Sequence, residues 1–146
     1  MSTLKDIRKK EDKMIVGYCY IVGDILHRGH IRHLKNCRAL CNKLICGVLS
    51  EKAVMEKKPK PILSLNERVE MVQIYVDAVV AQDQYSPTKN CKLIEPDILF
   101  ESDSHETHGD NGGRKIFVMP YYPNQSSTKI KEAIKNACNT PTGSSR

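Results

Sequence analysis

The chain has 146 residues, of which 40% are hydrophobic and 27% charged, and its formal net charge is +6. This length suffices for one domain with a real core and is too short for a second. No apolar run approaches the roughly 20 residues that cross a bilayer. Residues 1–13 are too charged for a signal peptide and too acidic for a transit peptide. We therefore expect a cytoplasmic protein without a membrane partner.

Short apolar runs rich in β-favouring residues alternate with helical patterns along the chain. Each run reads as a buried strand of a sheet that is covered on both faces. The predicted strands are residues 14–21, 44–50, 76–82, 97–101 and 115–120.

Four helices are predicted between and after these strands. Residues 31–43 repeat apolar side chains every three or four positions. Ser64 and Glu67 form a capping box that opens a helix over 64–75, and Pro87, after Ser86, would occupy the first position of the next helix. Hydroxyl residues open the last helix, over 126–138.

The alternation of strands and helices predicts an α/β protein, a Rossmann-like doubly wound parallel sheet of five strands with helices on both faces. We assign this domain to residues 14–138, a charged lead to 1–13 and a flexible tail to 139–146. In such sheets, ligands bind beyond the carboxyl ends of the strands. Segments 23–30, 57–60, 102–113 and the start of the last helix should therefore converge on one site.

His27 and His30 lie at the first strand-to-helix junction, in the stretch "GDILHRGHIRHL". Gly29 would let the backbone approach a ligand, while both imidazoles and the free N–H groups of the helix point at one anion. Two other interpretations stay open: a packing or capping role for the two histidines, and a zinc site that uses both as ligands. The zinc interpretation has less support, because no third ligand lies at a spacing typical of zinc sites.

Cysteine and charge are less informative. The six cysteines contain no C-x-x-C pair, and we expect buried free thiols, with Cys37 and Cys41, one helical turn apart, as the remaining metal alternative. The positive charge favours an anionic partner. Nucleic acid is one, but the basic residues are spread along the chain and tryptophan is absent, so a small polyphosphate accounts for the charge equally well.

Four segments in order carry a resemblance to a family. "VGDILHRGHIRHL" resembles the H-x-G-H signature of the nucleotidyltransferase superfamily, especially small cytidylyltransferases such as glycerol-3-phosphate cytidylyltransferase. "KKPKPILSLNERVEMV" resembles the family's lysine loop and the helix after it. "EPDILFESDSHE" and "MPYYPNQSSTKIKEAI" resemble its later segments, so the matches cover roughly residues 14 to 137.

The resemblance implies a reaction and the residues that serve it. A cytidylyltransferase transfers CMP from CTP to a small phosphate or phosphonate and releases pyrophosphate, with Mg²⁺ arriving on the triphosphate. His27, His30 and Lys58, or less favourably Lys60, would act on the reacting phosphates. The other positions that match nucleotide contacts are Ile21, Val22, Asp24, Gly29, Arg68, Asp103, Tyr121, Gln125, Ser126, Ser127 and Thr128. The family also implies a homodimer.

The chain departs from the family pattern at several of these positions. Ile21 and Gly23 replace the glycine and phenylalanine of the first motif, and the "GDDW" segment reads "SDSH". Tyr121 stands where the family has an arginine that helps to hold the nucleotide. The looser first motif resembles cytidylyltransferase-like domains attached to phosphoenolpyruvate mutases. A phosphonate such as 2-hydroxyethylphosphonate or 2-aminoethylphosphonate is therefore a plausible acceptor beside glycerol 3-phosphate and phosphoethanolamine.

Three other functions stay open. ATP could replace CTP on the same fold, giving an adenylyltransferase. The domain could bind nucleotides or nucleic acid without catalysis. His105 and His108, with Asp103 and Asp110, could hold the metal of a small hydrolase, although a solvated or substrate-facing loop is the better reading. We favour the transferase, which would need no nucleic-acid partner.

Overall fold

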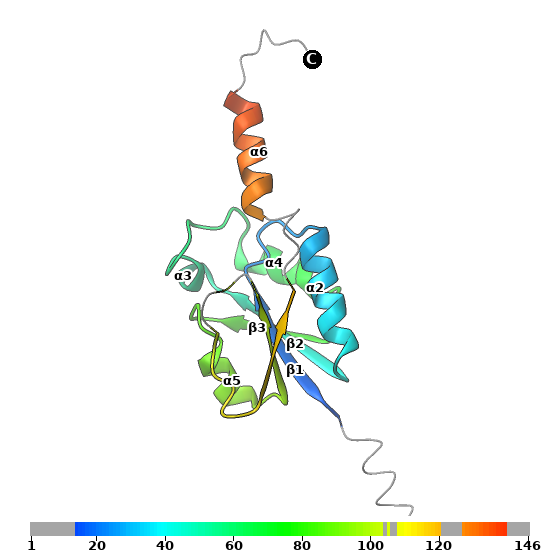
Figure 1. Cartoon of the computed structure of the whole chain (residues 1–146). Helices are drawn as coiled ribbons and strands as arrows, with labels where there is room; N and C mark the ends of the chain where they lie inside the picture. The colour runs from blue at the N-terminus through cyan, green and yellow to red at the C-terminus, as the bar shows by residue number, and fades with distance from the viewer. Residues whose placement is uncertain (1–13, 104, 106–107, 121–126, 140–146) are drawn as a thin grey trace, which may run out of the picture.

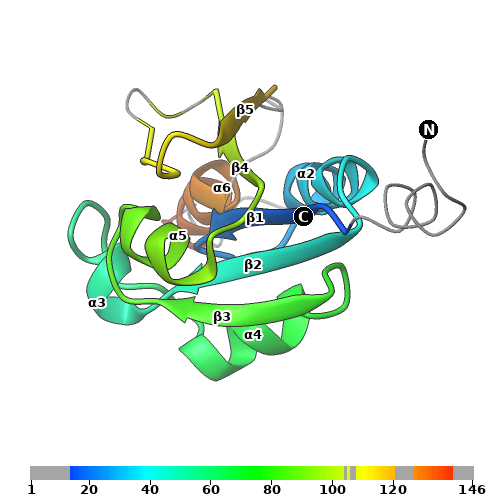
Figure 2. The same cartoon turned by 90° about the horizontal axis from the view of Figure 1, so that it is seen from below.

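The computed structural model describes residues 14–103, 105, 108–120 and 127–139. Five strands form one parallel sheet in the order β3-β2-β1-β4-β5 (Figures 1 and 2). The strands are β1 (Val16–Ile21), β2 (Lys43–Leu49), β3 (Ala78–Gln82), β4 (Ile98–Ser102) and β5 (Lys115–Met119). The chain builds outward from β1 to β3 and then returns to the other side of β1. The predicted doubly wound sheet is thus confirmed, and its switch point lies between β1 and β4.

Five helices are described, α2 (Arg28–Ala39), α3 (Glu51–Val54), α4 (Leu65–Val72), α5 (Thr88–Ile94) and α6 (Ser127–Asn139). Leu34 of α2 and Val72 of α4 are buried against one face of the sheet. Cys91 of α5 packs on the other face, against Tyr18 and Leu99. The helices therefore cover both faces, as the apolar strands require.

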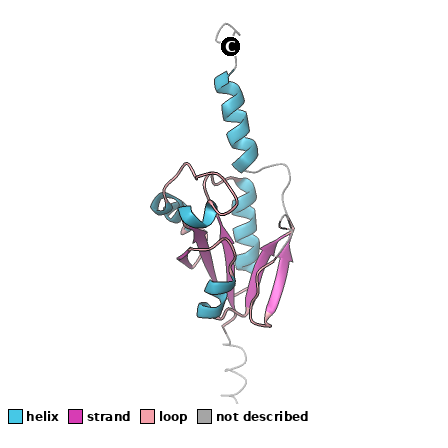
Figure 3. Ribbon diagram, turned by 90° about the vertical axis from the view of Figure 1, so that its left-hand side faces the viewer, coloured by secondary structure: helices cyan, strands magenta, loops and turns pink. Residues whose placement is uncertain are grey.

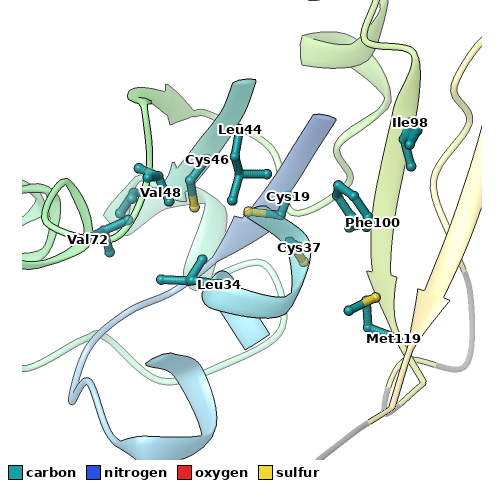
Figure 4. Packing of buried hydrophobic residues seen from close by; sticks show 11 residues of the cluster. Cys19, Leu34, Cys37, Leu44, Cys46, Val48, Val72, Ile98, Phe100 and Met119 are labelled. Carbon is teal, nitrogen blue, oxygen red and sulfur yellow. The ribbon is translucent and has the colours of Figure 1, made fainter. Parts of the chain in front are cut away.

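The main core lies between the sheet and the helices α2 and α4 (Figure 4). It contains Cys19, Cys37 and Cys46, whose side chains are fully buried among aliphatic neighbours. The five cysteines whose side chains are described are all free thiols, which confirms that prediction for them. Each buried aliphatic side chain here contributes about 1.5–3 kcal/mol by leaving water.

Several elements differ from the sequence prediction in their boundaries, and one helix was not predicted. Helix α2 begins at Arg28, inside the histidine motif, because His27 provides the cap that starts it. The short helix α3 was not predicted; Ser50 caps it through a hydrogen bond from the Ala53 N–H. Pro87 is the N-cap of α5 and not its first helical residue. The Ser64–Glu67 capping box of α4 is present in both directions, as predicted.

Helix α6 stands beyond the carboxyl ends of the strands and projects away from the sheet (Figures 1 and 3). Lys131 of α6 forms an ion pair with the buried carboxylate of Asp24, in the loop after β1. The first turns of α6 are thereby attached to the switch point. Among the described residues, no helix is long and apolar enough to span a membrane.

Candidate active site

A cavity of about 690 Å³ opens at the carboxyl ends of the strands, where the fold predicts a ligand site. Three sides contribute to its wall: the loop after β1 with the start of α2, the lysine-rich loop before α4, and the first turns of α6. The sequence-predicted residues that line it are Ile21, Val22, Asp24, His27, Gly29, His30, Lys58, Lys60 and Thr128. Segments 100 residues apart in the chain thus meet at one cavity.

The His27 side chain both starts α2 and faces the cavity. Its Nδ1 accepts a hydrogen bond from the Gly29 N–H at 2.9 Å, which satisfies one of the free donors at the start of the helix. A neutral imidazole that accepts at Nδ1 carries its proton on Nε2. This Nε2 is buried and has no hydrogen-bond partner among the described residues. His27 therefore offers a fixed, unused donor at the cavity wall.

His30 lies one helical turn further on and stacks on His27, with ring centroids 3.9 Å apart. Its Nδ1 is 3.4 Å from the His27 backbone nitrogen and completes a reciprocal capping box. It also hydrogen-bonds to the backbone of Ile25. The motif therefore fixes both ring planes by local backbone contacts, so the capping role that the sequence left open is real and coexists with a place in the cavity.

Both histidines are neutral in this environment. Burial lowers the pKa of His27. Burial, followed by the proximity of His27 and His33, lowers the pKa of His30 to about 4, and the Lys58 ammonium contributes in the same direction. At neutral pH the Nε2–H of His27 can donate a hydrogen bond to an anion, whereas the one proton of the neutral His30 ring is engaged by the backbone of Ile25. The positive charge of the site comes from lysines.

Four lysines line the cavity, from two sources. Lys58 and Lys60 belong to the loop before α4, and Lys131 and Lys135 belong to α6. Lys60 is paired with Glu51 at 3.7 Å, but both side chains are more than half exposed, so the pair is weak. Lys58 lies near enough to His30 for its ammonium to contribute to the lowered pKa of that ring. Lys131 is compensated by the Asp24 carboxylate, so Lys58, Lys60 and Lys135 supply most of the attraction of this part of the cavity for a polyanion.

Asp24 lines the cavity but is 1% exposed, and its oxygens are already engaged. The two oxygens accept hydrogen bonds from the backbone N–H groups of Ile62 and Leu63, at 2.9 and 2.8 Å, and one also pairs with Lys131. Burial alone would raise the pKa of this carboxyl, but the hydrogen bonds from Leu63, Lys131 and Ile62 outweigh it and the pKa is lowered. The geometry of Asp24 is that of a clamp between the lysine loop and α6.

Two predicted nucleotide contacts do not reach the cavity wall. Arg68 is fully buried, and its Nη1 donates to the carbonyls of Val22 and Leu49 at 2.8 and 2.6 Å, which joins the ends of β1 and β2. Asp103 is exposed and continues the β4–β5 pairing through its backbone N–H and the Met119 carbonyl at 2.9 Å. The sequence interpretation missed these backbone roles because carbonyl partners have no signature in the side-chain pattern.

Part of the predicted site lies outside the described residues. Tyr121, Gln125 and Ser126 are not among them, and Ser127 is described only as the first residue of α6. Thr128, the next residue, lies in the cavity wall.

Sequence reasoning missed several lining residues. Lys131, Glu132 and Lys135 share a helix face with Thr128 at spacings of three, four and seven, a pattern that could have been read from the sequence. Tyr20 and Tyr85 also line the cavity and had no recognisable signal. His105, which was considered as a substrate-facing residue, does line it.

The described residues contain no group of three or more metal-ligating side chains placed to hold an ion. The free donors at the cavity are N–H groups, which bind phosphate oxygens and not a cation. A Mg²⁺ ion that enters with a nucleotide triphosphate would therefore be held mainly by the triphosphate itself.

A doubly wound sheet with a histidine motif and a lysine-lined cavity at its switch point defines a nucleotidyltransferase domain. The chain belongs to the cytidylyltransferase-like family, whose model matches residues 23–133. This match spans the histidine motif, the lysine loop and the first turns of α6, which are the parts that build the cavity.

Known proteins agree with this assignment. The chain is 30% identical over 123 residues to the bifunctional protein HldE of Helicobacter pylori, a match that covers 80% of this chain and 27% of HldE. It is 29% identical over 119 residues to HldE of Campylobacter fetus, covering 77% of this chain and 26% of that protein. The chain thus corresponds to about a quarter of the length of these relatives.

Two solved structures share the fold. A lipopolysaccharide core biosynthesis protein from Thermoplasma volcanium superimposes with a TM-score of 0.64 at 22% identity, covering 75% of this chain and 98% of that one. A pantoate-beta-alanine ligase from Francisella tularensis superimposes with a TM-score of 0.55 at 14% identity, covering 92% of this chain and 75% of that one.

Proposed function

We propose that this domain transfers CMP from CTP to a small phosphate or phosphonate and releases pyrophosphate. The observation that carries the proposal is the Nε2–H of His27, which has no hydrogen-bond partner among the described residues and lies in the wall of the same cavity as four lysines. A buried donor without a partner is costly unless a ligand completes its hydrogen bond. A triphosphate supplies acceptor oxygens and the negative charge that four lysines attract.

The proposed reaction needs positioning and charge dispersal. An oxygen of the acceptor's phosphate or phosphonate attacks the α-phosphorus of CTP, and the bond from that phosphorus to the β-phosphate oxygen breaks. The electron pair leaves with pyrophosphate. No general base is required because the attacking oxygen is already anionic at neutral pH.

The residues divide this work by their position. The neutral His27 ring would donate a hydrogen bond from Nε2 to the α-phosphate, and Lys58 would neutralise charge that develops there. His30 stacks on His27 in the same wall and would contact the α-phosphate by exchanging its bond to Ile25 for one to the phosphate. Thr128 and the start of α6 would hold the β- and γ-phosphates, where the helix dipole favours anions. Lys131 and Lys135 extend the positive wall toward the leaving pyrophosphate.

The remaining parts of the proposal follow from the family and the chemistry. Mg²⁺ would accompany the triphosphate, and the domain would act as a homodimer in the cytoplasm. CTP is the proposed nucleotide because the family is cytidylyltransferase-like. The acceptor candidates are 2-hydroxyethylphosphonate, 2-aminoethylphosphonate, glycerol 3-phosphate and phosphoethanolamine.

The test is pyrophosphate release with Mg²⁺, comparing CTP, ATP, GTP and UTP against these four acceptors. Turnover that requires CTP and one acceptor is the expected result. Turnover with ATP in place of CTP would identify ATP as the nucleotide and leave the proposed mechanism unchanged. No release with any pair, together with salt-dependent binding of oligonucleotides, would refute the transferase and favour a nucleic-acid-binding module.

A further inference from the structure

A second part of the cavity wall carries a polar cluster that contains a buried carboxylate, in contrast to the lysine-lined part described above. It consists of Tyr20 at the end of β1, Glu101 near the end of β4, and His105 just beyond it. The Tyr20 hydroxyl donates to Glu101 Oε2 at 2.9 Å and lies 3.4 Å from His105 Nδ1. Tyr20 and His105 line the cavity, while Glu101 is fully buried behind them. Neither Glu101 nor Tyr20 belongs to the phosphate-binding segments described above.

The buried Glu101 gives this cluster its electrostatic character. Burial, and then the negative charge of Glu101, raises the pKa of Tyr20. The phenol therefore stays protonated and donates a hydrogen bond to the carboxylate. Glu101 Oε1 has no hydrogen-bond partner among the described residues. Among the described residues, the group that pairs with this carboxylate is His105 Nδ1, at 3.8 Å, which is charged only when protonated. A buried carboxylate with so little compensation attracts a cation.

Hydrogen-bond direction points the same way. Because the Tyr20 proton is committed to Glu101, the phenol oxygen presents lone pairs and accepts further hydrogen bonds. If His105 Nδ1 carries its proton toward Tyr20 and Glu101, the other ring nitrogen also becomes an acceptor. The cluster therefore offers acceptors backed by a negative charge, which suits a group that donates several hydrogen bonds and carries positive charge.

The wall beside the cluster is held rigidly. The Gln82 amide donates to the carbonyls of Gln84 and Tyr85, at 3.0 and 3.1 Å, and the Tyr85 N–H donates to Glu56 at 2.9 Å. The Tyr85 ring, 6.4 Å from the His105 ring, carries the Lys57 ammonium 4.9 Å from its centroid. Because the Lys58 ammonium also lies 6.0 Å from this centroid, the Tyr85 face is already taken by protein cations, and a ligand ammonium has to lie against Tyr20, Glu101 and His105.

We propose that Tyr20, Glu101 and His105 form a subsite for a primary ammonium group on the acceptor, so that the acceptor is an aminoalkyl phosphate or phosphonate. Its anionic end faces the lysines and histidines, and its ammonium faces the cluster. The inference rests on the proposed function, which supplies the acceptor. It goes further by selecting the amino compounds over their hydroxyl analogues.

The test uses two acceptors that differ only in the terminal group, 2-aminoethylphosphonate and 2-hydroxyethylphosphonate. The full chain with CTP and Mg²⁺ should show a kcat/KM at least about tenfold higher for the amine, because a buried charge left without its partner costs that much or more. Glu101→Gln, which keeps the shape and removes the charge, should raise the KM for the amine and bring the ratio close to one. Glu70→Gln, the same change on the exposed side of α4, should leave the ratio unchanged.

Glu101→Gln must change the acceptor ratio without changing the KM for CTP. If Glu101→Gln lowers kcat/KM by the same factor for both acceptors and also weakens the use of CTP, Glu101 has only a structural role and the subsite is refuted. Equal use of the two acceptors by the unaltered chain, or preference for the hydroxyl compound, refutes it as well.

Calorimetric binding of the two acceptors in the presence of CTP separates this inference from the proposed function. Preferential binding of the amine without turnover supports the subsite and refutes the transferase. Turnover without any amine preference supports the transferase and refutes the subsite. Absence of both turnover and binding refutes both.

Discussion

At the scale of single residues, His27 combines a structural and a chemical task in one ring. Nδ1 caps α2 by accepting from Gly29, and this bond fixes the proton on Nε2, which faces the cavity. A flexible donor would have to be ordered when the substrate binds. Here the helix cap orders the Nε2–H donor before the substrate binds, and such preorganised donors stabilise charge effectively in a transition state.

His27→Asn separates these two tasks. Asparagine is among the best N-cap residues, so the free energy of unfolding should change by less than about 1 kcal/mol. The shorter side chain cannot place a donor where Nε2 lies, and kcat/KM should fall about a hundredfold or more. Urea unfolding and the pyrophosphate assay measure the two effects. Full activity in His27→Asn would remove His27 from the mechanism.

His30 predicts a pH dependence of stability. Its pKa is about 4 in the folded chain and about 6.5 in an unfolded one. The unfolded state therefore takes up the proton first, and this contribution to stability is fully present above pH 6.5 and is lost as the pH falls from there through about 4. The loss amounts to about 1–2 kcal/mol once solvent screening is allowed for.

His30→Gln should remove this contribution. Urea unfolding of the original chain and the variant at pH 7.5 and pH 5 measures it, and the difference in stability between them should shrink at the lower pH. A constant difference would show that His30 is not held in its neutral form. His108→Gln, a change at an exposed histidine outside the cavity wall, is the matched control.

At the scale of elements, the site is assembled by buried polar clamps. Asp24 holds the lysine loop through two backbone N–H groups and holds α6 through Lys131. Arg68 fastens the ends of β1 and β2 through their carbonyls. These contacts convert loops, which are otherwise the least constrained parts of an α/β fold, into a positioned wall.

Asp24→Asn tests the clamp. The amide keeps one acceptor oxygen but loses the charge that pairs with Lys131, so we expect a loss of about 1–3 kcal/mol in stability. The lysine loop should become more susceptible to trypsin, with cleavage after Lys57, because Lys58 and Lys60 each precede a proline and are resistant. Digestion under native conditions, followed by mass spectrometry, measures this. Unchanged cleavage kinetics would mean that the loop is held by other contacts.

Gly47 of β2 makes room for a second buried network. Tyr18 Oη donates to Gln82 Oε1 at 2.5 Å, and a Cβ at position 47 would lie 1.9 Å from that hydroxyl. Gly47→Ala should therefore cost about 2–4 kcal/mol, since the buried pair cannot move without losing its hydrogen bonds. Thermal unfolding should register it. Gly113→Ala is not an equivalent control because Gly113 has a positive φ.

Much of the sheet could be predicted from the sequence, because buried parallel strands leave apolar runs that stand out between helical patterns. The start of α2 and the short α3 were less readable, since a histidine N-cap is unusual and four residues have no periodicity. The lysine face of α6 follows a helical spacing and was within reach. Arg68 and Glu101 were not, because nothing in a single sequence tells that a charged side chain will be fully buried.

At the scale of the whole molecule, a chain of net charge +6 brings four lysines, with Asp24 and Glu132, to one cavity. The strand order brings them there: β1 and β4 are neighbours at the switch point, and α6 stands beyond the carboxyl ends of the strands (Figure 1). The basic composition alone was compatible with several kinds of anionic partner. The cavity of about 690 Å³ favours a small polyanion among them.

The most direct test of nucleotide transfer is the identity of the bond that forms. Phosphorus NMR of the chain with CTP, Mg²⁺ and the preferred acceptor should show a new P–O–P linkage between the α-phosphate and the acceptor, with pyrophosphate appearing in equal amount. Orthophosphate or free CMP without that linkage would mean hydrolysis, and an unchanged spectrum would mean that the cavity binds nucleotides without transferring them. Either of these results would contradict the account.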